Sequence, residues 1–142
     1  MESMSKIEAV LFDLDGTLLD SFPDFLASLE NINIKSSSKK IDESIVRANV
    51  SDGSSKLLKL VFDIDKADEG FNGHKRNFLN EYEKNILMYG NLFLGISDLL
   101  NFLLDKKIPY GIVTNKPRKY TEIILKKSKR IFFQFLANYQ KS

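Results

Sequence analysis

The sequence lacks several features that define large classes of protein. None of its 142 residues is cysteine, which excludes disulfide bonds and thiolate metal sites. No apolar run approaches the roughly 18 residues that a membrane-spanning helix needs, and the N-terminus lacks the basic stretch and apolar core of a secretory signal. The single histidine, His74, is expected to be a solvated side chain rather than a catalyst. These absences predict a cytoplasmic protein with no membrane partner.

The charge of the chain is small overall but unevenly distributed. The formal net charge is +2, yet residues 106–142 hold ten lysines or arginines and a single acid, Glu122. Residues 1–105 therefore hold 11 basic and 18 acidic side chains. A basic end can bind nucleic acid. Because these positive side chains are mostly lysines spread over a helical pattern without a basic-aromatic repeat, nucleic-acid binding is kept only as an alternative.

The stretch VLFDLDGTLLDS, at residues 10–21, raises the first functional question. The run Ile7–Phe12 is short, apolar and bounded by Asp-Gly, which favours a buried parallel strand over a helix. Two carboxylates, Asp13 and Asp15, follow it, and in an extended segment both would point the same way. An Asp-Gly pair is also a frequent turn signal, so a purely structural turn stays open at this point.

The segment after this cluster has the periodicity of several helices. Asp20 or Ser21 is expected to cap a helix with Pro23 in its first turn, and a loop is expected at Lys35–Lys40. Three further amphipathic patterns follow, at Asp42–Ala48, around Leu57, Leu58, Val61 and Phe62, and around Phe71, Phe78, Leu79, Tyr82 and Ile86. These helices are expected to bury their apolar faces against one another.

A second strand follows the helical segment. A helix at Ile96–Asp105 leads into the strand-like run Tyr110–Thr114, which ends in TNKP and is followed by a helical pattern at Lys119–Lys127. We expect Phe78, Tyr82 and Phe102, which lie at helical spacing, to be core residues. Strands that alternate with helices predict an α/β fold with a parallel, doubly wound sheet, in which ligands gather at the carboxyl ends of the strands.

Both polar clusters, DLDGT and TNK, fall at such strand ends. Repulsion between Asp13 and Asp15 would be relieved by Mg²⁺, which prefers oxygen ligands and joins carboxylates to phosphates. One carboxylate could attack phosphorus to form an acyl phosphate, while the other serves as general acid and base. Gly16 would allow a sharp turn whose amides hold phosphate oxygens. Thr114 and Asn115 could grip the same phosphoryl group.

These motifs resemble a known family. DLDGTLLDS is similar to the first motif of the haloacid dehalogenase superfamily of phosphatases, and GIVTNKP to its second. Together with the cap-like segment RANVSDGSSKLL, at residues 47–58, they resemble the phosphoglycolate phosphatase branch over roughly residues 5–127. The resemblance implies a Rossmann-like parallel sheet at residues 1–20 and 90–142, with an inserted all-helical cap at 21–89.

The resemblance also implies roles for individual residues. Asp13 would be the nucleophile and a Mg²⁺ ligand, and Asp15 would be the acid/base and would bind the metal through its backbone carbonyl. Thr114 and Asn115 would contact the phosphate. The implied substrates are small phosphorylated metabolites, with 2-phosphoglycolate as the best single expectation.

The chain departs from the family after the second motif. Family members continue to a lysine that neutralises the phosphate and to acidic residues that complete the metal site, whereas this chain stops 28 residues after Thr114. A frameshift or premature stop would explain this, and we expect a truncated chain with an incomplete sheet, an exposed first strand and impaired activity. Whether Lys116, the nearest cation, replaces the missing lysine stays open.

Two non-catalytic interpretations therefore remain beside the phosphatase. The chain could be an inactive remnant that acts at most as a binding or association module, or the basic-tailed nucleic-acid binder described above. The tail at residues 128–142 contains a dense apolar group that could cover the sheet or promote self-association, namely Phe132, Phe133, Phe135, Leu136 and Tyr139.

Overall fold

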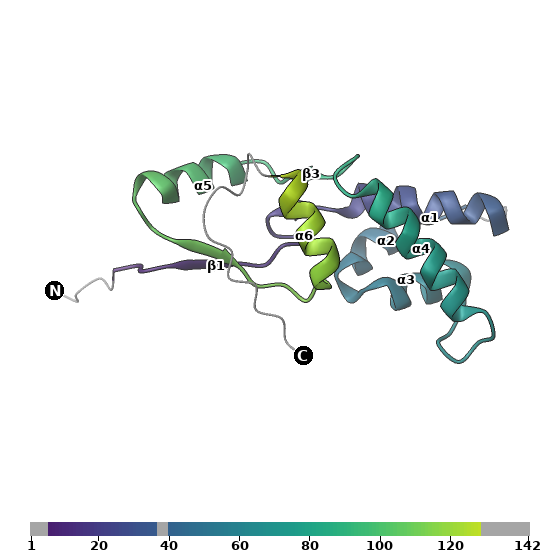
Figure 1. Ribbon diagram of the computed structural model, residues 1–142. Helices are drawn as coiled ribbons and strands as arrows, with labels where there is room; N and C mark the ends of the chain where they lie inside the picture. The colour runs from purple at the N-terminus through teal and green to yellow at the C-terminus, as the bar shows by residue number, and fades with distance from the viewer. Residues whose placement is uncertain (1–5, 37–39, 129–142) are drawn as a thin grey trace. The chain divides into compact units, whose positions relative to one another are not determined.

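The chain divides into two compact units. The computed structural model describes residues 6–36 and 40–128, so the expectations for the tail beyond Ser128 lie outside the described residues (Figure 1). One unit combines Met1–Leu19 with Leu92–Ser142, and the other is Asp20–Asn91. The chain passes between them at β2 (Leu19–Asp20) and β3 (Asn91–Leu92), which pair with each other.

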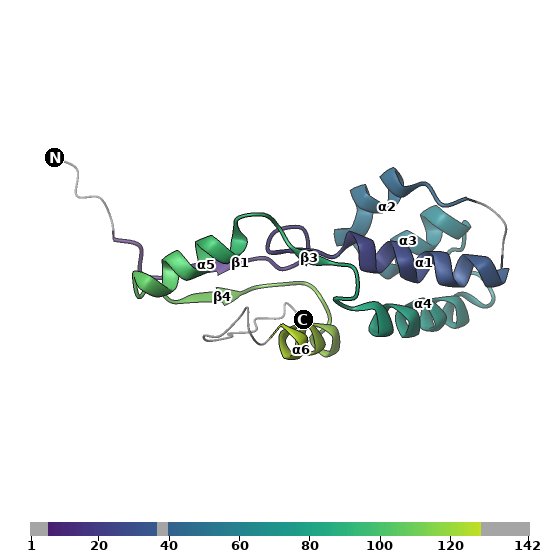
Figure 2. The same cartoon turned by 90° about the horizontal axis from the view of Figure 1, so that it is seen from above.

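The first unit is built on a pair of parallel strands. β1 (Val10–Phe12) pairs with β4 (Tyr110–Ile112), with Phe12 beside Ile112. Parallel neighbours need a crossover connection, and here the chain makes the whole helical unit and then α5 (Ile96–Asp105) before it returns as β4. Figure 2 shows α5 running alongside the strand pair. α6 (Arg118–Lys127) follows β4, so the α/β order expected from the sequence is confirmed.

The two faces of this strand pair are covered unequally. On one face Tyr110 is buried and meets the Phe12 ring edge-on, with 6.2 Å between the centroids. On the other face Leu11 is 67% exposed. Phe102, expected in the core, is 52% exposed, so that prediction is wrong. Leu100 and Leu103 are the buried side chains of α5 instead. They lie three residues apart on one face of the helix, and Phe102 lies outside that face.

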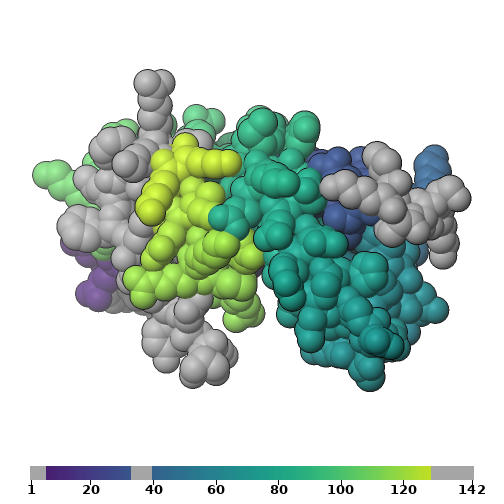
Figure 3. Space-filling model, turned by 45° about the vertical axis from the view of Figure 1, so that its right-hand side comes forward, coloured from purple at the N-terminus to yellow at the C-terminus, as the bar shows by residue number. Residues whose placement is uncertain are grey.

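The second unit is entirely helical apart from its connecting strands. Its elements are α1 (Phe22–Ser36), α2 (Glu43–Asn49), the short 3₁₀ helix η1 (Val50–Asp52), α3 (Ser54–Phe62) and α4 (Phe71–Asn85). α2 begins where the sequence suggests, because the Asp42 carboxylate accepts hydrogen bonds from the Ser44 and Ile45 N–H groups, at 2.9 and 3.4 Å. In the space-filling view the side chains of α4 form a continuous surface (Figure 3).

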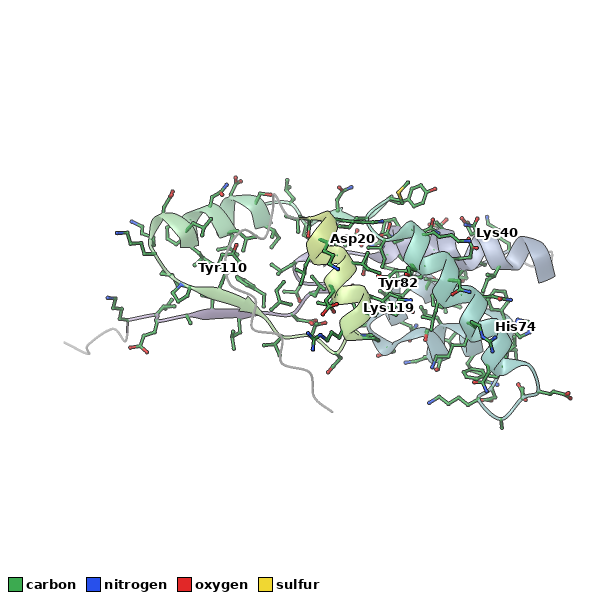
Figure 4. All side chains as sticks on the ribbon, in the orientation of Figure 1. Asp20, Lys40, His74, Tyr82, Tyr110 and Lys119 are labelled. Carbon is green, nitrogen blue, oxygen red and sulfur yellow. The ribbon has the colours of Figure 1, made fainter. Side chains whose placement is uncertain are left out.

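A stack of aromatic rings forms the centre of the helical unit. Phe25 of α1 lies against Tyr82 of α4 with 4.2 Å between ring centroids, and Phe78, one turn earlier on α4, lies 6.0 Å from Phe25. Phe78 and Tyr82 are both buried, as the sequence predicts, and Tyr82 is labelled in Figure 4. Because these residues recur at i and i+4, one helix face supplies both rings.

A buried carboxylate fixes the loop that follows α4. Asp24, in the first turn of α1, is 1% exposed and accepts hydrogen bonds from the backbone N–H groups of Leu87, Tyr89 and Gly90 at 2.8–2.9 Å. A side chain at position 90 would not fit, because its Cβ would lie 2.7 Å from Asp24 Oδ2. The carboxylate therefore accepts the backbone hydrogen bonds that a neighbouring strand would otherwise accept from the loop that leads back to the first unit.

Several element boundaries differ from the sequence-based expectations. Both strands are shorter than expected, three residues each, because the hydrogen-bonded ladder covers only Val10–Phe12 and Tyr110–Ile112. α1 continues through Lys35 to Ser36, into the expected loop, since neither residue is a helix breaker. Within the described ranges, no helix combines the length and apolarity needed to cross a membrane.

Candidate active site at the strand ends

The carboxyl ends of β1 and β4 lie side by side. The Val113 N–H donates to the Phe12 carbonyl at 2.8 Å, so the parallel pairing continues to the last residue before Asp13. Asp13 and Asp15 follow β1, and Thr114 and Asn115 follow β4. The register of the two strands therefore brings both sequence motifs to one edge of the sheet, which is where α/β folds place ligands.

A tight turn around Gly16 follows the two aspartates. Gly16 has a φ of 82°, which favours glycine, and its N–H donates to the Leu19 carbonyl at 2.9 Å. The Leu18 and Leu19 N–H groups both donate to the Leu14 carbonyl. The expected sharp turn is confirmed, and the Gly16 N–H is used within it. That the amides of this turn hold phosphate oxygens stays a prediction.

The two aspartates have different surroundings. Asp13 is exposed, and within the described ranges no group donates a hydrogen bond to its carboxylate. The carboxylate of Asp15 accepts two hydrogen bonds from Lys116 Nζ, at 3.1 Å to Oδ1 and 2.9 Å to Oδ2. Asp13 is thus open to a ligand, and Asp15 is held in place.

Thr114 and Asn115 complete this edge of the sheet. Thr114 is buried, and its Oγ1 accepts a hydrogen bond from the Lys116 backbone N–H at 3.1 Å. The hydroxyl hydrogen of Thr114 stays available to donate, since this bond uses the oxygen only as an acceptor. Asn115 is exposed next to it. Both residues can donate hydrogen bonds to an anion at the strand ends.

The side chains and backbone at this edge offer oxygen atoms, which are the ligands that Mg²⁺ prefers. No group of three or more histidine, cysteine or acidic side chains within the described ranges is arranged to hold a metal. Mg²⁺ commonly uses only one or two carboxylates and completes its six ligands with water and substrate phosphate. The open carboxylate of Asp13 and the oxygens of Asp15 supply donors of that type.

Two residues of this architecture carried no assigned role from the sequence. From the sequence, Lys116 is only the nearest cation, whereas the structure shows that its place two residues after Thr114 and the parallel register together bring it to the β1 end. Asp24 lies in the PD pair that follows the first motif. Nothing in the local pattern indicated that its carboxylate would bind a loop more than 60 residues away.

Comparison with known proteins identifies the family of the chain. The family model of haloacid dehalogenase-like hydrolases matches residues 10–141. An N-acetylmuramic acid 6-phosphate phosphatase from Pseudomonas putida is 32% identical over 84% of this chain and 54% of its own length. A phosphoglycolate phosphatase from Xanthomonas campestris is 38% identical over 82% of this chain and 52% of its own length. The chain thus spans about half the length of these curated relatives.

Solved structures show the same fold. A predicted phosphoglycolate phosphatase from Haemophilus somnus superposes with a TM-score of 0.76 at 23% identity, over 96% of this chain and 64% of the other. A haloacid dehalogenase-like family hydrolase from Streptococcus pneumoniae gives the same TM-score and identity over 96% and 62%. With the family match over residues 10–141, the chain belongs to the haloacid dehalogenase-like hydrolases.

Proposed function

We propose that this chain carries the catalytic core and cap of a magnesium-dependent phosphomonoesterase. The observation that carries the proposal is the open Asp13 carboxylate next to the ordered Asp15 carboxylate, at the carboxyl end of a strand whose parallel neighbour ends in Thr114. The first unit would be the catalytic core, and the helical unit Asp20–Asn91 would be the cap.

The proposed reaction has two steps. In the first, which starts with Asp15 protonated, a carboxylate oxygen of Asp13 attacks phosphorus, the bond from phosphorus to the ester oxygen breaks, and Asp15 gives its proton to the leaving alcohol. In the second, Asp15 takes a proton from a water molecule, whose oxygen attacks the phosphorus of the acyl phosphate, and the bond from phosphorus to the Asp13 oxygen breaks. Inorganic phosphate leaves and the Asp13 carboxylate is restored.

The other residues at this edge would bind and orient the phosphoryl group. The Thr114 hydroxyl and the Asn115 amide or N–H would donate hydrogen bonds to its oxygens. Mg²⁺, held by Asp13 and the Asp15 backbone carbonyl, would offset the repulsion between the phosphate and the Asp13 carboxylate.

The proposed substrate is a small phosphorylated metabolite. The relatives are named for two such esters, 2-phosphoglycolate and N-acetylmuramic acid 6-phosphate. We take 2-phosphoglycolate as the first candidate, because the relatives named for it include one of 38% identity. The cap-like segment at 47–58, which contains η1 and Gly53, supports the same branch.

A hydrolysis assay with Mg²⁺ tests the proposal. We expect the chain to release phosphate from p-nitrophenyl phosphate and from one of the two named esters, and chelation of Mg²⁺ to abolish the release. Asp13→Asn should lower the rate by at least about 10³-fold, because it removes the nucleophile. Asp105→Asn, at an exposed acid of α5 in the same unit, is the control and should leave the rate unchanged. Equal rates for the chain and Asp13→Asn would instead favour a non-catalytic binding module.

A further inference from the structure

Among the ion-paired cations of the described residues, Lys116 is the most deeply buried. Its side chain is 3% exposed, and that of its partner Asp15 is 14% exposed. In ion pairs elsewhere in the described ranges, Arg47 and Arg118 are 55% and 73% exposed. An ammonium group that has lost its water is stable only when a charged partner and hydrogen bonds replace that water. The Lys116 pair is therefore an ordered part of the site and not a mobile surface contact.

The pair restricts what the Asp15 carboxylate can do. Both of its oxygens accept from Lys116 Nζ, and Lys116 is fixed in turn by the bond from its own N–H to Thr114 Oγ1. The Thr121 hydroxyl donates to the Lys116 carbonyl at 3.4 Å. The end of β4 and the start of α6 thus position the ammonium, and the ammonium positions the carboxylate.

Asp13 and Asp15 are separated by a single residue, so without other contacts both carboxylates could bind the same metal ion. A divalent cation at this edge gains from each carboxylate that it can reach, so free Asp13 and Asp15 side chains would both turn toward it. The structure leaves the Asp13 carboxylate open and pairs that of Asp15.

We propose that Lys116 is a positioning residue that keeps the Asp15 carboxylate away from the metal, so that Asp13 alone offers its carboxylate to Mg²⁺. This inference rests on the proposed function, since it explains how two similar side chains take different roles in it. Asp15 keeps its role as acid and base in the proposed reaction, and Lys116 acts only through its contact with the Asp15 carboxylate.

Titration calorimetry with Mg²⁺ on the full chain tests whether Lys116 keeps the Asp15 carboxylate from binding the metal. In Lys116→Met the released Asp15 carboxylate becomes a second ligand, and we expect Mg²⁺ to bind roughly fivefold more tightly or better. Lys116→Arg keeps the charge in place, and its dissociation constant should stay within about twofold of the unsubstituted chain.

A double-mutant cycle separates a released ligand from a simple loss of positive charge. In the Asp15→Asn background, Lys116→Met should no longer tighten Mg²⁺ binding. A gain that persists in this background would overturn the proposal, as would unchanged or weaker binding in Lys116→Met. Absence of Mg²⁺ binding in every variant would overturn it as well.

A measurement on the unsubstituted chain covers the case in which Lys116→Met does not fold. Carboxyl ¹³C resonances followed during a Mg²⁺ titration should shift strongly for Asp13 and little for Asp15. A larger shift at Asp15 would contradict the inference. Because these experiments measure binding, they can succeed when the hydrolysis assay fails, and failure of each proposal is recognised separately.

Discussion

The two units of the molecule use opposite strategies to bury apolar surface. The helical unit closes its core with its own residues, since the rings of Phe25, Phe78 and Tyr82 stack between α1 and α4. The α/β unit covers one side of its strand pair and leaves Leu11 and Phe102 more than half exposed. Stability and chemistry are therefore separated here: the helical unit has the better-packed core, and the α/β unit has the paired charges of the candidate site.

The largest contrast is expected from one substitution in each unit. Phe78→Ala opens a cavity in a fully buried stack and should lower the free energy of unfolding by about 4 kcal/mol. Phe102→Ala removes a half-exposed ring of α5 and should cost less than about 1 kcal/mol. Urea unfolding followed by circular dichroism measures both values. Similar costs for the two variants would mean that Phe102 is covered in solution and that the contrast between the units is smaller than it looks.

A smaller effect is expected at the carboxylate that fixes the loop after α4. Asp24→Asn places an amide where an oxygen accepts from backbone N–H groups, and we expect a loss of about 3 kcal/mol. Glu30→Gln, at an exposed acid on the same helix, is the matched control and should change the stability little. A loss below about 1 kcal/mol for Asp24→Asn would show that the loop keeps its position without this charge.

The smallest effect is expected at a buried hydroxyl of the α/β unit. The Tyr110 hydroxyl on β4 has no hydrogen-bond partner among the described groups (Figure 4), so Tyr110→Phe should change the stability by less than about 1 kcal/mol near neutral pH. Burial raises the pKa of Tyr110 above its usual value of 10.0. The folded state therefore holds this proton more tightly, and stability is lost as the pH rises above about 10.

Unfolding curves at pH 8 and pH 11 test this assignment. The difference in stability between the two pH values should be smaller for Tyr110→Phe than for the unsubstituted chain. A large loss for Tyr110→Phe already at pH 8 would instead mean that the hydroxyl is hydrogen-bonded in solution.

Much of the fold was predictable because it follows from local periodicity. The apolar spacing of Phe78 and Tyr82 marks one helix face, and the limits of α5 at Ile96–Asp105 agree with the pattern. The same spacing placed Phe102 in the core wrongly, because periodicity identifies an apolar stripe and not what packs against it. The turn at Gly16 was predictable because glycine favours it. The hydrogen bond from the Gly16 N–H to the Leu19 carbonyl was not predictable, because it depends on how the chain folds back at Leu19.

The sequence by itself determined which chemical groups follow each strand: two carboxylates after β1, and a hydroxyl, an amide and an ammonium after β4. These are local properties of neighbouring residues, and strand alternation and turn chemistry make them readable. Only the tertiary structure decided that Lys116 pairs with Asp15 across 101 positions of sequence, and that Asp24 binds a loop 63 to 66 positions away. The physical reason is that burial removes water from these charges, so each must find its partner wherever the fold, and not the sequence, brings one within hydrogen-bond distance.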